Sequence, residues 1–352
     1  MDRSELQPYL CDLERRVDPA GEAALDAQWR AFLDGRRGDT PIFTPRRPAA
    51  SPPGIAWPTV PINDALEDSS LMALRELAGA SAHLAAGDGA PLAVRCNYGT
   101  GILPSLFGAE LFFMDRALDT LPTSRPLPGG REAIRRLLDA ALPDLRAGWG
   151  ARVWDMADFF VTLLAPYPKL RRFVQIYHPD LQGPMDVCEL LWGSALFLDL
   201  HDEPDLLRAL LDRVTETYER FMDEWLRRFP VRDGVSAHWA LMHRGAIMLR
   251  DDSAMNFSPE MFGEFIAPWD GRLLTRFSGA IHFCGRGSHY ISQAARLPGL
   301  TGIQLSQPHL NDMETIYANT VDRGIPLLNF DRATAESALA AGRDLHGRVH
   351  CA

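Results

Sequence analysis

The stretch AIMLRDDSAMNFSPEMFGEFIAPWDGRLLTRFSGAIHFCGRG, residues 246–287, contains one complete strand–helix–strand pattern. An apolar run, Ala246–Leu249, leads into two carboxylates and then a helix start, where Ser258 can cap the helix and Pro259 fits its first turn. Apolar residues then recur at helical spacing over Pro259–Phe277, which predicts a helix there, and a second short apolar run follows at Ala280–Phe283. Because strands that alternate with helices normally pair in parallel, this stretch predicts two parallel strands joined by a helix.

The same alternation continues on both sides of this stretch. Further β-type runs are predicted at Leu92–Cys96, Arg172–Tyr177, Val235–Trp239, Thr301–Leu305, Pro326–Phe330 and Gly347–Ala352. Further helices are predicted at Ser70–Ala86, Gly130–Ala147, Pro204–Phe229, Asn311–Arg323 and Ala333–Gly342. About seven or eight such units favour an α/β fold, a (β/α)8 TIM barrel that closes with the last run and lacks its last helix. A doubly wound sheet is the alternative, weakened because no G-x-G-x-x-G turn follows a first strand.

The first 60 residues are predicted to form an N-terminal arm. An amphipathic helix is expected around Ala20–Leu33, and the segment Arg46–Gly54 that follows is too rich in proline for regular structure. The barrel is then predicted to comprise residues 61–352.

Composition argues against several kinds of chemistry. The chain has 352 residues and a formal net charge of -10, and Lys169 is the one lysine among its 36 basic residues. Lys169 follows two prolines and precedes an arginine pair, unlike the lysine of a P-loop, a protein kinase or a pyridoxal-phosphate enzyme. The acidic balance and the scattered arginines argue against nucleic-acid binding.

The sequence predicts a cytoplasmic enzyme. Its N-terminal residues are polar, unlike the apolar core of a signal peptide, and no apolar run approaches the roughly 18 residues that span a bilayer, so no membrane partner is expected. The five cysteines, at positions 11, 96, 188, 284 and 351, are odd in number and widely spaced. Reduced thiols, some of them metal ligands, are therefore expected in preference to disulfides.

The most informative motif is His282-Phe283-Cys284 within the second apolar run. Side chains alternate along a strand, so His282 and Cys284 are expected on one face and Phe283 on the other. A histidine and a cysteine at the carboxyl end of a strand are suitable ligands for a thiophilic metal, and zinc fits best. The alternative is a buried cysteine packed beside a hydrogen-bonded histidine, which two residues alone do not exclude.

A third ligand is available in the last β-type run. If Gly347–Ala352 closes the barrel, Cys351 is expected to lie within reach of His282 and Cys284. Three protein ligands leave the fourth position of a zinc ion open, which is the arrangement of catalytic sites. Such a zinc ion can bind a substrate thiol and raise its reactivity at neutral pH.

Two carboxylates follow the first apolar run. Asp251 and Asp252 can raise each other's pKa, and one of them can act as a general acid or base, with Asp252 the better candidate. In the alternative, Asp251 pairs with a neighbouring arginine and Asp252 caps the turn.

Two further strand-end loops and one strand residue carry groups suited to lining a substrate pocket. The candidate substrate-binding residues are Asn97, Tyr98, Gln175, Tyr177 and His238. Each of these signals is weak alone, because turn chemistry explains the neighbouring glycines and prolines, and His238 is as well explained as a core histidine.

From about residue 90 to its end, the sequence resembles the uroporphyrinogen decarboxylase superfamily. This superfamily includes the porphyrinogen decarboxylase and zinc-dependent methyltransferases that act on methylcobalamin proteins and thiols. The resemblance lies in the segments Leu181–Asp186, Asp202–Leu207, Asp251–Asp252, Asn256–Phe262, Ile281–Gly285 and Leu297–Ile303.

The resemblance implies a (β/α)8 barrel and favours the methyltransferase branch. In that branch, zinc is held by a His-x-Cys pair and a cysteine on the last strand, positions that match His282, Cys284 and Cys351. The decarboxylase branch carries an Arg-Gln-Ala-Gly-Arg motif near its N-terminus, and this sequence has none. The D-x-H-x-x-G corrinoid motif is also missing, since residues 344–349 read DLHGRV, so any corrinoid must arrive on a partner protein.

Three hypotheses follow. The first is a zinc-dependent methyltransferase that moves a methyl group between a corrinoid protein and a thiol or small methylated substrate. The second is a metal-free porphyrinogen decarboxylase, a lyase in which Asp252 would hold pyrrole N–H groups. The third is a non-catalytic barrel that binds a small molecule. The sequence leaves the oligomeric state open.

Overall fold

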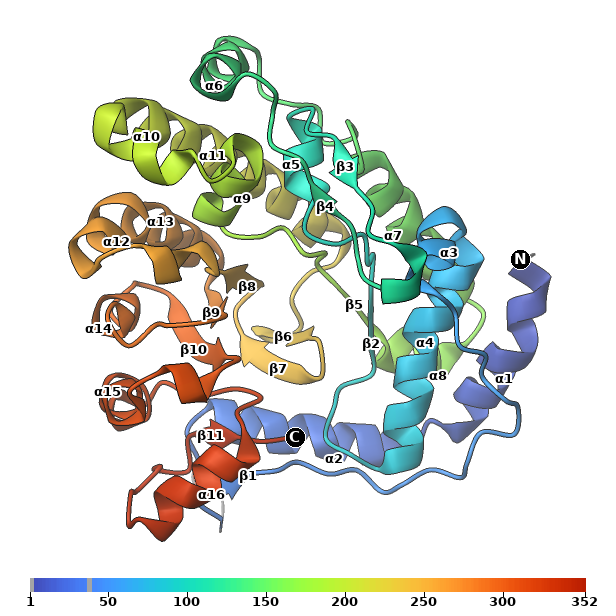
Figure 1. Cartoon of the computed structure of the whole chain (residues 1–352). Coiled ribbons are helices and arrows are strands. Elements are labelled where there is room, and N and C mark those ends of the chain that lie inside the picture. Colours follow the sequence, from blue (N-terminus) through green and yellow to red (C-terminus); the bar gives the residue numbers. More distant parts are fainter. Residues whose placement is uncertain (1–2, 37–39) are drawn as a thin grey trace.

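Short strands lie around the centre of the molecule and helices surround them (Figure 1). This computed structural model describes residues 3–36 and 40–352, so the first two residues of the polar N-terminus lie outside it. The strands are β1 (Ile42–Phe43), β2 (Ala93–Arg95), β3 (Leu111–Phe112), β4 (Thr123–Ser124), β5 (Gln175–Tyr177), β6 (Val235–His238), β7 (Leu241–Arg244), β8 (Ile247–Arg250), β9 (Gly279–Phe283), β10 (Leu300–Leu305) and β11 (Val349–His350).

Most of the helices are longer than the strands, and they are distributed along the described parts of the chain. The α-helices are α1 (Gln7–Arg16), α2 (Pro19–Leu33), α3 (Ile62–Glu67), α4 (Ser69–Ala86), α5 (Ile102–Leu106), α6 (Gly130–Asp139), α7 (Gly150–Leu164), α8 (Pro168–Phe173), α9 (Pro184–Trp192), α10 (Leu196–Asp202), α11 (Pro204–Arg228), α12 (Pro259–Phe265), α13 (Ala267–Phe277), α14 (Ile291–Ala294), α15 (Met313–Asn319) and α16 (Arg332–Ala340). No helix of residues 3–36 and 40–352 is both long enough and apolar enough to cross a membrane.

Strands β8, β9 and β10 form a parallel ladder, as the strand–helix–strand pattern predicts. Beyond β10, Leu327 bridges Ile303 on one side and Val349 of β11 on the other, and β11 pairs in parallel with β1. A second parallel pair joins β2 and β5. The α/β class is therefore confirmed. Leu327 thus links the β8–β10 ladder to β11 and β1, whereas β2 and β5 form a separate pair. The described strands do not form a closed ring, so closure into a barrel stays a prediction.

The strands of the β8–β10 ladder are buried on both faces. On the face toward the helices, Leu249 and Ile281 belong to the main apolar core. On the opposite face, Met248 and Ala280 belong to a second apolar cluster. Burial on both sides explains why these strands read as continuous apolar runs in the sequence, as parallel strands usually do.

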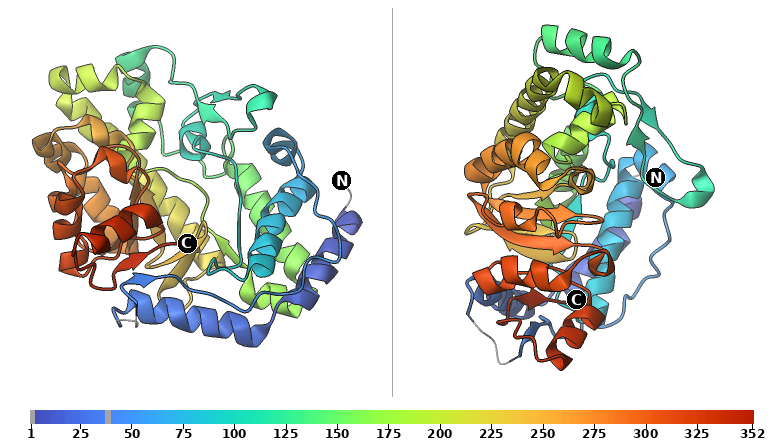
Figure 2. Two further views of the ribbon diagram at one scale, coloured as in Figure 1. Left: turned by 60° about the horizontal axis from the view of Figure 1, so that its bottom comes forward. Right: turned by 60° about the vertical axis from the view of Figure 1, so that its left-hand side comes forward.

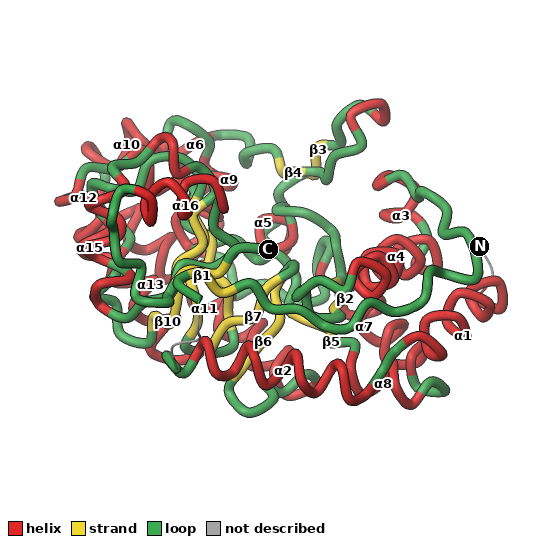
Figure 3. The backbone as a smooth tube through the Cα atoms, turned by 90° about the horizontal axis from the view of Figure 1, so that it is seen from below, coloured by secondary structure: helices red, strands yellow, loops and turns green. Residues whose placement is uncertain are grey.

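The predicted N-terminal arm supplies part of this second cluster. Helix α2 lies along one end of the strand set (Figures 2 and 3), and its Trp29 and Phe32 are buried in the second cluster. The Trp29 ring is centred 4.4 Å from that of His350, and the Phe32 ring stacks on Phe43 of β1 at 4.4 Å. Since Met248 and Ala280 lie near the amino ends of β8 and β9, α2 covers the amino end of the strands.

Some predicted elements differ from the observed ones. The helix expected over Pro259–Phe277 is interrupted at Ile266, because Pro268 cannot donate a backbone hydrogen bond and its ring conflicts with a carbonyl one turn earlier. The run Pro326–Phe330 contributes a bridge at Leu327 in place of a full strand. Strand β7, which pairs antiparallel with β6 in a hairpin, was not predicted.

Candidate metal centre

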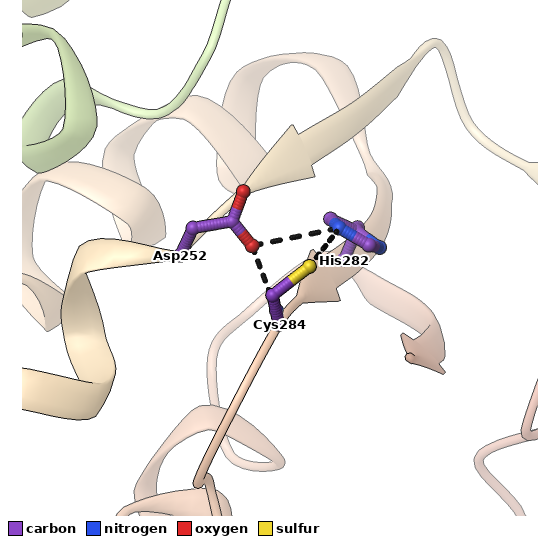
Figure 4. Close-up of side chains that lie close together, drawn as sticks. All are labelled: Asp252, His282 and Cys284. Atoms are coloured by element: carbon purple, nitrogen blue, oxygen red, sulfur yellow. Dashed lines mark hydrogen bonds and ion pairs between the residues drawn. The ribbon is translucent and has the colours of Figure 1, made fainter. Parts of the chain in front are cut away.

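Three potential metal ligands converge at the carboxyl end of the β8–β10 ladder. His282 lies on β9, Cys284 directly follows β9, and Asp252 lies two residues beyond β8 (Figure 4). Arg250 pairs with His282 across the ladder, and the backbone N–H of Asp251 donates to the carbonyl oxygen of His282 at 2.9 Å. One ligand atom from each side chain of Asp252, His282 and Cys284 lies within 4.8 Å of the other two.

The distances between these atoms suit a tetrahedral metal ion. Nε2 of His282 is 3.4 Å from Sγ of Cys284 and 3.5 Å from Oδ1 of Asp252. A zinc ion with bonds of about 2.0 to 2.3 Å in tetrahedral geometry would hold such atoms about 3.3 to 3.6 Å apart. Both distances to His282 therefore suit a zinc ion, and the nitrogen, sulfur and oxygen donors of the three side chains are ones that zinc accepts.

The imidazole of His282 is held in the tautomer that a metal requires. Its Nδ1 donates a hydrogen bond to the side-chain oxygen of Gln304 on β10. Burial lowers the pKa of His282, which favours the neutral ring. With the proton on Nδ1, the lone pair of Nε2 faces Cys284 and Asp252, and Gln304 acts as the outer partner that commonly orients a metal-binding histidine.

The charges of the group also favour a cation. Burial and the nearby Asp252 carboxylate raise the pKa of the Cys284 thiol. Oδ1 of Asp252 accepts the backbone N–H of Cys284 at 2.7 Å and also faces the unprotonated Nε2 of His282. Two acceptors at this separation repel each other weakly, and a bound cation would remove the repulsion and stabilise the Cys284 thiolate.

Cys351 does not belong to this group, which corrects the predicted ligand set. His350 packs against Trp29 and Phe43 in the second apolar cluster. Because side chains alternate along a strand, Cys351 then faces the helices together with Val349 and is fully buried in the main core. There, burial raises the pKa of its thiol to about 11. Asp252 takes the place predicted for Cys351, and all five cysteines are free thiols.

Asp251 and Asp252, adjacent in the chain, occupy different environments. Side chains alternate along β8, so Asp252 points to the same side as Met248 and Arg250. This side is the inner face of the ladder, opposite the face toward the helices. Asp251 is buried, and Oδ2 of its carboxylate has no hydrogen-bond partner within the described part of the chain. Burial first, and the neighbouring Asp270 second, raise the pKa of Asp251 well above its ordinary value. Asp251 is therefore a buried neutral acid outside the ligand group, and no described arginine pairs with it, contrary to the alternative from the sequence.

Two of the five predicted pocket residues, Tyr177 and His238, lie near the centre. Gln175 lies at the amino end of β5, where its Oε1 accepts the backbone N–H of Ala237 at 3.2 Å. The Tyr177 ring packs 4.8 Å from the ring of His238, and Nε2 of His238 lies 3.0 Å from a guanidinium nitrogen of Arg250. Tyr177 and His238 are thus already engaged with each other and with Arg250, the ladder partner of His282.

The remaining two predicted pocket residues have structural contacts. The side-chain amide of Asn97 donates to Glu76 on α4 at 3.0 Å. The ring of Tyr98 packs edge-on against Trp149 within the main core. Tyr98 therefore packs in the main core, and its role in substrate binding stays a prediction.

Several residues around the centre were not predicted from the sequence. Buried Arg250 forms an ion pair with Asp180 at 3.3 Å and lies 4.3 Å over the ring of Trp239. Trp239 in turn packs edge-on against the imidazole of His282 at 5.0 Å. The alternation of side chains along β8 and β10 could have indicated that Arg250 and Gln304 face inward. Trp239 and Asp180 lie in loops, where no alternating pattern indicates the direction of a side chain.

Comparison of the chain with protein-family models gives no match, and comparison with curated proteins gives none either. The one lysine is excluded from the chemistry of the centre, because Nζ of Lys169 donates to the carbonyl oxygen of Val17 at 2.8 Å, outside the ligand group.

Proposed function

We propose that the protein is a zinc-dependent methyltransferase of the uroporphyrinogen decarboxylase type, which moves a methyl group between a corrinoid carried by a partner protein and a thiol or small methylated substrate. The observation that carries the proposal is the convergence of Asp252, His282 and Cys284 at distances suited to a tetrahedral ion. The parallel strands and outer helices support a (β/α)8 barrel, in which active sites lie at the carboxyl ends of the strands.

The number of ligands supports a catalytic role for the metal. Three protein ligands leave one position for substrate, whereas structural zinc sites usually have four. When bound, the zinc ion supplies a Lewis acid that lowers the pKa of a coordinated thiol and makes it a nucleophile at neutral pH.

The residues of the chain fix the metal and balance its charge. Gln304 holds the His282 imidazole, and the backbone N–H of Cys284 holds the Asp252 carboxylate. The Cys284 thiolate and the Asp252 carboxylate together carry two negative charges, which match one divalent ion. In the proposed transfer the methyl carbon would pass from the cobalt of the corrinoid to the substrate sulfur, and the electron pair of the methyl–cobalt bond would remain on cobalt. The thiol proton would pass to solvent water beforehand.

Porphyrinogen decarboxylation is the weaker alternative. Its substrate carries several carboxylates and needs cationic partners. The buried guanidinium groups of Arg250 and Arg95 both face Asp180, at 3.3 and 3.9 Å, so their charge is already partly compensated.

A direct assay tests the proposal. Zinc-loaded protein is incubated with methylcobalamin, as a substitute for the corrinoid protein, and a panel of small thiols, and the methyl thioether is measured by mass spectrometry. We expect thioether formation that Cys284→Ala reduces at least about 100-fold and that Cys351→Ala leaves within a few-fold of the original protein. No thioether with any thiol from zinc-loaded protein, or equal loss in both variants, would contradict the proposal.

A further inference from the structure

A pocket of about 470 Å³ adjoins the metal centre and shares Asp252 with it. Its walls come from α9, from the turn after β8, and from the segment between β2 and α6. The charged residues of its lining are all acidic: Asp186, Glu189 and Asp252. The other polar residues of its lining carry hydroxyl or amide groups, and none is a lysine, arginine or histidine. This composition differs from the paired charges on the remainder of the inner face.

An unpaired buried hydroxyl points to a ligand in this pocket. Ser124 lines the pocket and is 7% exposed, and its hydroxyl has no hydrogen-bond partner among the described residues. Buried polar groups normally have such a partner, so a polar group of a bound molecule would supply the hydrogen-bond partner that the Ser124 hydroxyl lacks. Glu189 has one carboxylate oxygen bonded to the hydroxyl of Ser253 at 2.6 Å, which leaves its second oxygen for a ligand.

A bound metal does not cancel the acidic character of the pocket. The Cys284 thiolate and the Asp252 carboxylate compensate the two positive charges of a zinc ion. Both carboxylate oxygens of Asp186 already accept backbone N–H groups, from Asp252 at 3.1 Å and Ser253 at 2.7 Å. Glu189 is then the acidic group left to face the pocket without a compensating cation of the lining. An organic cation would restore the balance at close range, where the low dielectric of a partly buried site strengthens the attraction.

The lining also distinguishes between kinds of organic cation. Quaternary ammonium groups are usually held by aromatic rings, and no aromatic residue lines this pocket. Carboxylate, hydroxyl and amide oxygens are instead hydrogen-bond acceptors, which suit a cation that carries N–H donors.

We infer that this pocket is the substrate site and that it binds a small protonated amine, with the ammonium group at Glu189 and the remainder of the molecule reaching toward the metal at Asp252. The inference rests on the proposed function for the role of the metal. It adds that the substrate carries a protonated amine, separate from the group that reaches the metal.

Calorimetric titration of the zinc-loaded protein with three probes of similar shape tests this inference. The probes are N,N-dimethylethanolamine, which is protonated at neutral pH; choline, which is cationic without an N–H donor; and 3-methylbutan-1-ol, the neutral carbon analogue of the amine. We expect the amine to bind at least tenfold more tightly than the alcohol and several-fold more tightly than choline. Equal binding of all three probes, or tighter binding of choline than of the amine, would overturn the inference.

A matched pair of variants locates the binding. Glu189→Gln retains an acceptor for Ser253 and removes the charge, so we expect it to weaken amine binding about tenfold while zinc content is unchanged. Glu132→Gln, an equal change on the exposed helix α6, should leave amine binding unaltered. If Glu189→Gln also leaves it unaltered, the pocket assignment is wrong. Thiol methylation without any amine preference would overturn this inference alone, whereas absence of zinc would overturn the proposed function.

Discussion

The Nε2 atom of His282 and the Sγ atom of Cys284 lie 3.4 Å apart at the carboxyl end of β9. The two residues are separated by one position in the chain, so the alternation of the strand directs both to the inner face. Gln304 on the neighbouring strand fixes the ring of His282, and Asp252 approaches from the end of β8. Three adjacent parallel strands thus each contribute to one centre.

Gln304 is expected to act through His282 on metal affinity. Gln304→Leu removes the acceptor of the Nδ1 proton, and loss of such outer partners commonly weakens metal binding by about 10- to 100-fold. Competition with a chromophoric chelator measures the zinc affinity. Gln304→Glu serves as the control, because it retains an acceptor and should bind zinc at least as tightly as the original protein. Equal zinc affinity in Gln304→Leu and the original protein would show that the hydrogen bond has no role.

Asp251 is expected to be a structural acid with no part in metal binding. Its folded-state pKa is raised by burial, so the unfolded chain ionises this group at lower pH than the folded chain does, and the stability falls as pH rises above about 4. Asp251→Asn removes this penalty. Urea denaturation should show that the variant gains stability relative to the original protein between pH 5 and pH 8, with zinc content unchanged. A loss of zinc in this variant would place Asp251 in the metal centre.

Buried His350 is expected to make the fold sensitive to acid. Burial lowers its pKa to about 3, and Nδ1 accepts the backbone N–H of Asn329 at 3.0 Å, so the folded protein holds this ring neutral. The unfolded chain protonates it near pH 6.5, so its stabilising contribution is complete above that pH and is lost at about 1.4 kcal/mol per pH unit as the pH falls toward 3.

The substitution His350→Asn tests this dependence, since the amide oxygen can accept the same hydrogen bond and does not titrate in this range. Unfolding free energies measured between pH 7.5 and pH 5 should decline less steeply in the variant than in the original protein. Parallel declines would show that His350 takes up no proton on unfolding.

The helix α2 of the N-terminal arm is expected to be integral to the fold. Trp29 is fully buried between α2, β1 and β11, and its indole N–H donates to the carbonyl oxygen of Gly89 at 2.8 Å. Trp29→Ala should lower the free energy of unfolding by about 3 to 5 kcal/mol, as truncation of a buried tryptophan usually does. Trp57→Ala, a change on a half-buried residue of the same arm, is the comparison and should cost less. A loss below about 1 kcal/mol for Trp29→Ala would mean that the arm packs independently.

The sequence predicted those features that depend on local periodicity. Alternation along the chain indicated the parallel strands, and the spacing of His282 and Cys284 indicated a shared face. The same alternation applied to β11 would have placed His350 on the inner face and Cys351 on the face toward the helices. Pro268, likewise visible in the sequence, marks the interruption between α12 and α13.

Other features depend on contacts between distant segments. Strand β1 consists of Ile42 and Phe43, which favour strands but are too few to form an alternating pattern, and it pairs with β11 from the far end of the chain. The inward position of Asp252 depends on where β8 ends, and Trp239 reaches His282 because a hairpin turn brings it there. Pairing of this kind is decided by tertiary packing, which local patterns do not specify.

The zinc content of purified protein, measured by mass spectrometry of the metal, tests the central claim most directly. The original protein and its Cys284→Ala, Asp252→Asn and Cys351→Ala variants are compared after dialysis, with circular dichroism confirming that each is folded. We expect about one zinc ion per chain in the original protein and in Cys351→Ala, and a severe loss in Cys284→Ala and Asp252→Asn. Zinc retained in Cys284→Ala, or lost in Cys351→Ala alone, would contradict the assignment of Asp252, His282 and Cys284 as the metal centre.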